Sequence, residues 1–334
     1  MSHLVETMFY VGAVPWHGLG EKLDAPPTCE EAIIQAGLDW SVEACPVYMQ
    51  KQLYGEDHRQ VLAENTFDDL PEAQVVRRCN DGNVLGVVGP RWTPVQNRDA
   101  FDFFDPMVQS GEAILHTAGS LNDGKTVWIL AQIGETRNII GDDGVGQFLL
   151  LSMGHDGKRA VQVMPTPIRV VCANTLGAAE YGSAQGKTMV KIAHTRNATR
   201  RLNQVGDFIR PHLASFDATM ELFQILAKAN VSSQAADAYI TGLFPDPKDP
   251  DANSSFAERV RREIMAKFEG DLLGYDAIPE QFKRSYWTLY NAVTEYVDHD
   301  RGSDKHRMNS AWFGSGTSLK QQALDLAKEK VVTS

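Results

Sequence analysis

The sequence predicts an α+β fold, in which an antiparallel, hairpin-rich sheet packs against helices and the C-terminal part is mainly helical. Two turns predict the sheet. Asn122-Asp123-Gly124 separates the apolar runs "AILHTAGSL" and "KTVWILAQI", and a turn around His155-Asp156-Gly157 separates "GQFLLLSMG" from "KRAVQVMPTPIRV". Asn, Asp and Gly are the residues that tight hairpin turns favour. The helical part is predicted by long amphipathic stretches, the first of which begins with "ATRRLNQVGDFIRPHL".

The elements before these hairpins have recognisable boundaries. Thr28, followed three positions later by Glu31, is a capping-box pattern and predicts a short helix that ends at Gly37. "WSVEACPVYM" alternates as a strand does, and its Pro46 marks an edge or a bulge. "NVLGVVG" is a further strand, and "RDAFDFFDPMVQ" is a helix that we expect Asn97 to cap.

The chain after the second hairpin predicts helices. "VCANTLGAAEYG" and a long amphipathic stretch precede "DPKDPDANSS", a linker rich in Pro, Asp and Ser. "SFAERVRREIMAKFEG", "SYWTLYNAVTEYVDH" and a closing helix follow it. We therefore expect an α+β core domain with a basic strip at 1–245, a linker at 246–255 and a helical C-terminal region at 256–334.

Composition excludes some classes of protein. A hydrophobic content of 43% is sufficient for a packed core, and a net charge of −11 argues against a protein that coats DNA by bulk charge. No apolar run approaches the ~20 residues of a membrane-spanning helix. The four cysteines form no C-x-x-C pair, which favours reduced thiols in a cytoplasmic protein.

The charge is nevertheless unevenly distributed. Glu56 to Glu72 is strongly acidic, while Lys187 to His212 is strongly basic. An acidic protein with one concentrated basic strip can bind a polyanion locally. The interpretation that competes with this one is a solvated helix face.

Two further motifs could carry chemistry. "GSGTSLK" lacks the spacing of a phosphate-binding loop, because Lys320 follows the last glycine too late. We expect Thr317 or Ser318 to cap the closing helix there, after a turn at positive φ at a glycine of "GSG". Glu295 and His299 share a helix face without the two-histidine spacing of a zinc site, which favours a salt-bridged surface. The sequence predicts no catalytic residue, metal or cofactor.

The candidate phosphate-binding residues are cations after the second hairpin turn, on its returning strand and along the basic strip. Arginines four and five residues apart on one helix share a broad face that suits a run of backbone phosphates. The predicted nucleic-acid-binding residues are Lys158, Arg159, Arg169, Lys187, Lys191, Arg196, Arg200 and Arg201.

Several motifs resemble a known family. "MSHLVETMFYVGAVPWHGLG", "VVGPRWTPVQNRDAFDFFD", "RVVCANTL", "LYNAVTEYVDH" and "SAWFGSG" resemble the "phage/plasmid-like protein" family, a domain of unknown function carried by phages, plasmids and integrated elements. The resemblance implies a protein of the bacterial host cytoplasm, but it brings no activity and no catalytic residues. The order of hairpins, helix and basic strip also resembles, by architecture alone, the core of single-strand annealing recombinases, which form rings or filaments around a basic groove.

These observations predict a phage- or plasmid-encoded protein that binds and anneals single-stranded DNA in recombination, without a catalytic step. Its partners would be single-stranded DNA and further copies of itself, with Tyr290, Trp312 and Phe313 at the homo-oligomer interface. One alternative is an interaction protein that counters a host defence system through the acidic surface of Glu56 to Glu72. A second is a hydrolase or nuclease whose site the sequence does not locate.

Overall fold

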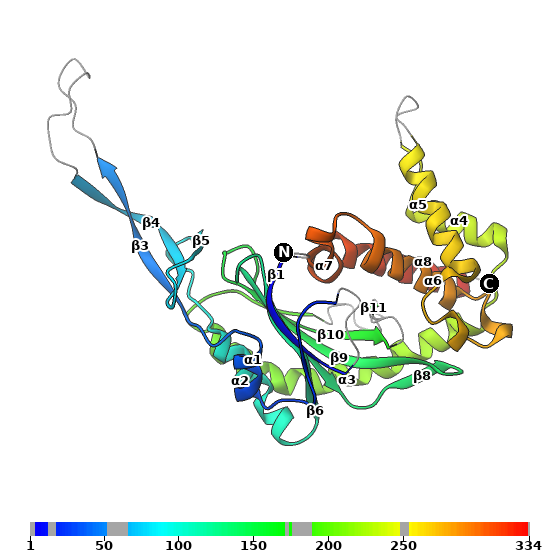
Figure 1. Cartoon of the computed structure of the whole chain (residues 1–334), viewed down its shortest axis with the longest axis horizontal. Helices are drawn as coiled ribbons and strands as arrows, with labels where there is room; N and C mark the ends of the chain where they lie inside the picture. The colour runs from blue at the N-terminus through cyan, green and yellow to red at the C-terminus, as the bar shows by residue number, and fades with distance from the viewer. Residues whose placement is uncertain are drawn as a thin grey trace, which may run out of the picture.

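The computed structural model describes residues 4–12, 18–51, 66–170, 174–175, 189–247 and 254–332, with the backbone alone described at residues 51, 66, 174–175 and 206–215. It has the α+β fold that the sequence predicts, with antiparallel sheets and with helices concentrated in the C-terminal part (Figure 1). Within these ranges, every helix is too short or too polar to cross a lipid bilayer.

Nine strands of the described chain form the main sheet, in the order β11-β10-β9-β7-β6-β1-β2, with β12 also paired to β10 and β8 to β9. Both predicted hairpins are confirmed, as β6–β7 and β9–β10. Asn122, Asp123 and Gly124 all have positive φ, as the turn chemistry predicts. The strands are β1 (Val5–Val11), β2 (Glu21–Leu23), β6 (Ala113–Leu121), β7 (Thr126–Ile133), β8 (Arg137–Ile140), β9 (Asp143–Gly154), β10 (Val161–Arg169), β11 (Asn174–Thr175) and β12 (Val190–Ile192).

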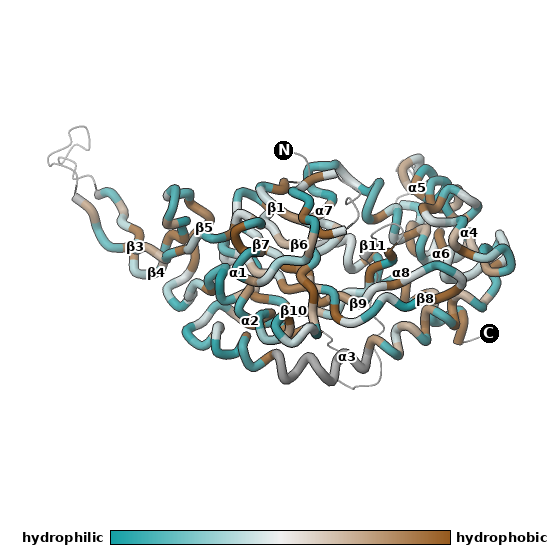
Figure 2. Tube along the Cα trace, turned by 60° about the horizontal axis from the view of Figure 1, so that its bottom comes forward, coloured by the Kyte–Doolittle hydropathy of each residue, from teal (hydrophilic) through white to brown (hydrophobic). Residues whose placement is uncertain are grey.

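Helices α1 (Cys29–Gln35) and α2 (Asn97–Gln109) pack with the sheet around the first hydrophobic core. Figure 2 shows apolar residues along the central strands and the helices beside them. The capping box of Thr28 and Glu31 is confirmed. The predicted cap of α2 is wrong by one residue, because Gln96 precedes the helix and Asn97 is buried inside its first turn.

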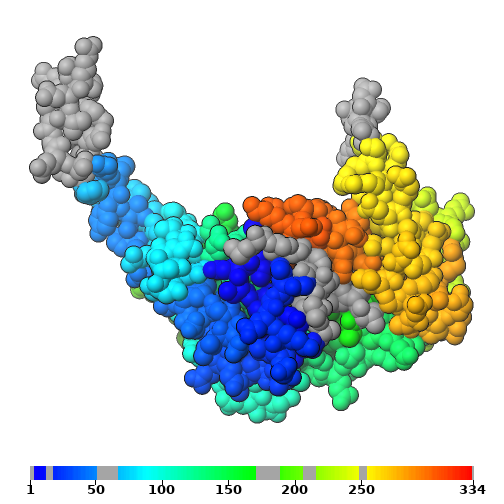
Figure 3. All heavy atoms as spheres, viewed as in Figure 1, coloured from blue at the N-terminus to red at the C-terminus, as the bar shows by residue number. Residues whose placement is uncertain are grey.

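A second, three-stranded sheet projects from the body as an arm (Figures 1 and 3). It contains β3 (Val42–Lys51), β4 (Thr66–Arg78) and β5 (Val84–Val88). The register of β3 against β4 shifts at Pro46, where the sequence predicts an edge or a bulge. The arm carries many exposed apolar side chains, because it has little of the body to pack against. They are Tyr48, Met49, Phe67, Val84 and Val87.

The C-terminal helices surround a second hydrophobic core around Phe223, Trp287 and Tyr290. The long helix α3 joins the two cores, since Leu202 lies in the first and Phe223 in the second. The helical core therefore begins inside α3, before the predicted linker, of which residues 248–253 lie outside the described chain. The helices are α3 (Ala198–Lys228), α4 (Ser233–Leu243), α5 (Ser255–Ala266), α6 (Tyr286–Glu295), α7 (Asp304–Phe313) and α8 (Ser315–Val332), with short turns η2 (Lys267–Asp271), η3 (Tyr275–Ala277), η4 (Glu280–Phe282) and η5 (Tyr296–Asp300).

The predicted cap of the closing helix is wrong. Helix α7 runs through the aromatic pair to Phe313, and α8 already begins at Ser315, so Thr317 lies inside α8 and donates to the Ala311 carbonyl at 3.0 Å. Gly314 has a φ of −128°, and Gly316 does not have positive φ. A Cβ at Gly316 would lie 2.8 Å from the Ser310 carbonyl oxygen, so this glycine allows α7 and α8 to approach each other closely.

Candidate nucleic-acid interface

The start of α3 is held against two other parts of the fold. The backbone amide of Thr93 donates a hydrogen bond to the His194 carbonyl at 3.1 Å, and the Thr199 hydroxyl donates one to Asp99 of α2 at 3.2 Å. The rings of Trp92 and His194 stack with centroids 4.8 Å apart. These contacts fix the orientation of the first turn of α3 relative to β12 and α2.

Five of the predicted phosphate-binding side chains are exposed around this junction, and we call them the basic surface: Lys158, Lys191, Arg196, Arg200 and Arg201. Lys191 lies on β12 opposite Gln162 of β10, while the arginines lie just before and in the first turn of α3. Among the described residues, no carboxylate forms an ion pair with any of the five. Their positive charge is therefore available to an anionic partner.

Two other predicted cations do not belong to this surface. Arg169 is fully buried, where its Nε donates to Asp143 Oδ1 at 2.7 Å and its Nη1 to the Leu273 carbonyl at 2.8 Å. Asp143 also accepts from the Trp287 indole at 2.7 Å, so the group ties the sheet to α6. The prediction that Arg169 contacts phosphates is therefore wrong, because it has no donor at the surface.

Arg159 is half-buried, and its guanidinium lies 4.6 Å from the centre of the Phe313 ring. Burial lowers the pKa of Arg159. It therefore packs toward α7, while its neighbour Lys158 faces solvent. Lys187 lies outside the described residues.

Sequence reasoning missed two exposed arginines beside the basic surface. Arg91 precedes Trp92, which stacks on His194, and Arg98 lies in the first turn of α2 next to Asp99. A basic residue adjacent to an aromatic one in "GPRWTPV" is the signal that could have identified Arg91. Nothing in the sequence brings α2 beside α3.

The three aromatic residues predicted at an oligomer interface have different environments. Tyr290 is completely buried in the helical core, so the prediction that it contacts another subunit is wrong. Trp312 and Phe313 are half-buried, and Trp312 packs edge-on against Trp128 of the sheet at 6.3 Å. Their density reflects the packing of α7 on the sheet.

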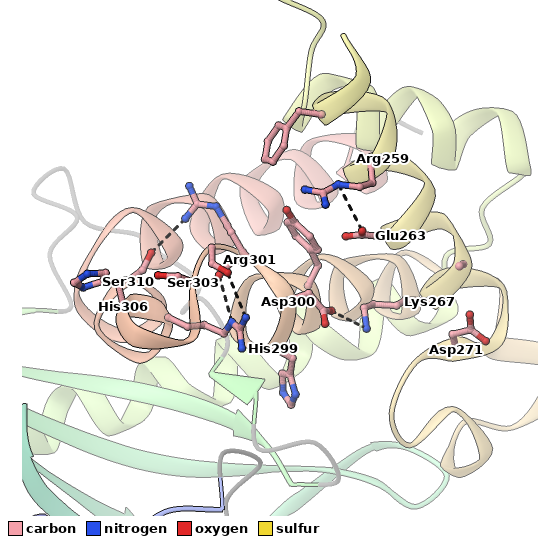
Figure 4. Close-up of a pocket in the computed structure, with 15 residues that line it drawn as sticks. Arg259, Glu263, Lys267, Asp271, His299, Asp300, Arg301, Ser303, His306 and Ser310 are labelled. Carbon is pink, nitrogen blue, oxygen red and sulfur yellow. Dashed lines mark hydrogen bonds and ion pairs between the residues drawn. The ribbon is translucent and has the colours of Figure 1, made fainter. Parts of the chain in front are cut away.

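A second polar feature is an open cleft of about 980 Å³ between α5, η2, η5 and α7 (Figure 4). Lys267 is neutralised inside it by Glu295 at 2.7 Å and Asp300 at 3.0 Å. Its charged and histidine lining consists of Arg259, Glu263, Lys267, Asp271, His299, Asp300, Arg301, His306 and Arg307. The cleft thus contains strongly paired charges, such as Lys267, and cations whose ion pairs are weak, such as Arg259, which lies 3.9 Å from Glu263.

The carboxylates considered for a metal site are engaged in ion pairs. Glu295 binds Lys267, and Asp298 binds Lys320 at 2.7 Å, with both members of that second pair buried. These ion pairs were expected at the surface, but Glu295, Asp298 and Lys320 are buried in the protein interior. Across the described ranges, no group of His, Cys, Asp and Glu side chains has the geometry of a metal site.

A family model for the domain of unknown function DUF932 matches residues 84–317, which is more than half of the chain. The chain belongs to this family. The match begins at β5 and includes the basic surface and the cleft, whereas β3 and β4 of the arm precede it. Comparisons with curated proteins and with solved structures gave no match.

Proposed function

We propose that this DUF932 protein binds single-stranded DNA through the basic surface and promotes strand annealing in recombination, without a catalytic step. The observation that carries the proposal is the group of five exposed cations that form no ion pair with any described residue, in a chain whose net charge is −11. Such cations bind backbone phosphates and release counterions, which gives affinity without reading sequence. Bases that are not contacted remain free to pair with a second strand.

Annealing also requires neighbouring copies to extend the DNA track, and we propose that the protein is a homo-oligomer encoded by a phage or a plasmid. The projecting arm supports self-association, because exposed apolar side chains such as Tyr48, Phe67 and Val87 mark protein–protein contacts. Its two outer strands, β3 and β5, present edges that could pair with another chain.

The test is fluorescence anisotropy with a labelled oligonucleotide of mixed sequence at several salt concentrations. Five phosphate contacts would give a log-log salt slope of about −3.5, from about −0.7 per contact on single strands. The double variant Arg200→Glu, Arg201→Glu should lose binding, because both side chains lie in the first turn of α3.

A matched control changes the net charge equally at a distance. Arg262→Glu, Lys305→Glu reverses two exposed cations on α5 and α7 that do not line the cleft, and it should bind as the unchanged protein does. Equal losses in both double variants would show that bulk charge alone governs binding. No binding by the unchanged protein at low salt would refute the proposal.

A second candidate is an interaction protein that counters a host defence through an acidic surface. It is supported by the position of Asp68, Asp69 and Glu72, which are exposed on β4 of the projecting arm. Glu56 and the rest of the acidic run to residue 65 lie outside the described chain. Capture of a host protein that is lost in Asp69→Lys, Glu72→Lys, with oligonucleotide binding unchanged, would favour this candidate over the first.

A further inference from the structure

Three arginines line the cleft between α5 and α7. Arg307 is paired with Asp304 at 2.8 Å, whereas Arg259 and Arg301 have no close carboxylate partner among the described residues. Figure 4 shows Arg301, after η5, on the side of Ser310 and His306 of α7, and Arg259 of α5 on the opposite side, near Glu263. Lys267 and Asp271 lie on the same side as Arg259, and Lys267 is paired with Asp300. The two weakly paired arginines thus flank the cleft.

Arg301 is oriented without being neutralised. Its Nη1 donates to the hydroxyl oxygens of Ser310 at 3.3 Å and Ser315 at 3.0 Å. Within the described chain, its Nε and Nη2 donate no hydrogen bond and no carboxylate pairs with it. The two hydroxyl partners fix the plane of the guanidinium, while its charge and remaining donors stay free. This arrangement suits an oxyanion that accepts two parallel hydrogen bonds.

Arg259 is similarly available. Its nearest carboxylate is that of Glu263, with Nε and Oε1 as far apart as 3.9 Å, and its side chain is 58% exposed. The distance is beyond that of a hydrogen bond, so the pair is a weak, solvated one. Two arginines that face one hollow repel each other unless an anion lies between them.

A phenol hydroxyl and an aromatic rim complete the site. Burial raises the pKa of the Tyr296 phenol, and the Glu263 and Asp300 carboxylates raise it further, whereas the guanidinium groups of Arg301 and Arg259 lower it. The phenol therefore lies among both arginines and both carboxylates of the cleft. Phe256 lines the mouth of the cleft and is 63% exposed, with the Arg259 guanidinium 5.4 Å from the centre of its ring. It offers a stacking face to a planar group.

We propose that this cleft is a binding site for a phosphomonoester, whose phosphate oxygens are held between its two sides by Arg259, Arg301 and the Tyr296 hydroxyl. A nucleotide is the source that the rim favours, since a base could stack on Phe256 while the phosphate lies between the arginines. The site is separate from the basic surface, because no residue of the basic surface lines the cleft. It does not depend on the proposed DNA-binding function.

Isothermal titration calorimetry with AMP, glycerol phosphate and adenosine tests the site. Both phosphomonoesters should bind saturably and adenosine should not, and tighter binding of AMP than of glycerol phosphate would identify a nucleotide as the ligand. Arg301→Gln and Arg259→Gln should each weaken AMP binding roughly tenfold or more, as expected for a charge-assisted hydrogen bond. Tyr296→Phe should weaken it less.

Arg262→Gln is the matched control, because Arg262 is exposed on the same helix as Arg259 but does not line the cleft. It should bind AMP unchanged. Arg259→Gln removes only a solvated side chain, so it should stay folded and give an answer even if Arg301→Gln does not. Adenosine binding as tightly as AMP, or AMP affinity that is unchanged in Arg259→Gln and Arg301→Gln, would overturn the proposal. Failure of AMP binding to saturate at about 10 mM would also overturn it, because such an affinity is weaker than that of an ordinary specific site.

The two proposals fail separately. Arg200→Glu, Arg201→Glu should bind AMP normally, and Arg301→Gln should bind the oligonucleotide normally. Loss of AMP binding in the first variant would place the phosphate at the basic surface and refute the cleft as its site.

Discussion

Arg169 and Arg200 are both arginines in a basic part of the sequence, yet the fold gives them opposite environments. Arg169 lies on a strand covered by the C-terminal helices and is fully buried with Asp143. Arg200 lies in the first turn of α3 and is exposed with no ion pair among the described residues. A buried cation must be paired to compensate for its lost hydration, whereas an exposed one is free to bind another molecule. The comparison shows that exposure decides whether a cation supports the fold or offers a binding contact.

The largest effect should come from breaking the buried pair. Arg169→Met should lower the free energy of unfolding by about 3–5 kcal/mol, because Asp143 would keep a buried charge whose one remaining side-chain partner among the described residues is the Trp287 indole. Chemical denaturation measures it. Arg200→Met is the matched control and should change stability by less than about 0.5 kcal/mol. Equal effects of the two changes would contradict the comparison.

The buried imidazole of His155 extends the comparison of buried and exposed groups to a dependence of stability on pH. Burial lowers the pKa of His155 from its ordinary value of 6.5 to about 3. Its Nε2 lies 2.9 Å from Asn97 Oδ1, while the Asn97 amide nitrogen donates to the Leu38 and Trp40 carbonyls, so the imidazole is the donor.

Between pH 6.5 and about pH 3 the unfolded chain binds a proton at His155 that the folded chain does not. Stability should therefore fall as the pH falls through this window, by about 2 kcal/mol between pH 7 and pH 5 from this residue alone. His155→Gln should flatten the dependence in denaturation experiments at a series of pH values. An equally steep dependence in this variant would assign the effect to other groups.

Another buried cation, Lys320, lies on α8, whose approach to α7 depends on Gly316. Gly316→Ala should cost about 1–2 kcal/mol, because the new Cβ would contact backbone atoms of Ser310 and Ala311 that cannot move independently. Gly89→Ala, where the added Cβ meets nothing within 4 Å, is the control for thermal unfolding. A neutral Gly316→Ala would show that the two helices can separate without cost.

The smallest expected effect concerns Arg200, the exposed arginine of the comparison. Arg200→Gln should leave the unfolding free energy within about 0.5 kcal/mol and reduce the salt slope of oligonucleotide binding by about 0.7, the contribution of one phosphate contact. Arg262→Gln should leave both quantities unchanged. A slope that does not change in Arg200→Gln would exclude this residue from the interface.

The sequence by itself determined the local elements. Positive φ at Asn122 to Gly124, the capping box at Thr28 and the register shift at Pro46 follow from properties of one to four adjacent residues. The helical pattern of the C-terminal part is local in the same sense, because apolar spacing is visible along the chain. The helix boundaries could not be predicted where tertiary contacts determine them. The start of α2 is an example, because the side-chain amide of Gln96 forms hydrogen bonds with the backbone of Val42 in a distant strand.

Only the tertiary structure decided which charged residues are exposed and which distant ones meet. The sequence shows Arg169, Lys158 and Arg200 as similar cations, but the packing of α6 on the sheet buries the first and leaves the others in water. The junction of α2 and α3 and the cleft between Arg259 and Arg301 join segments far apart in sequence. Because the energy of a charge depends on its three-dimensional surroundings and not on its neighbours in the chain, no linear pattern could have located these sites.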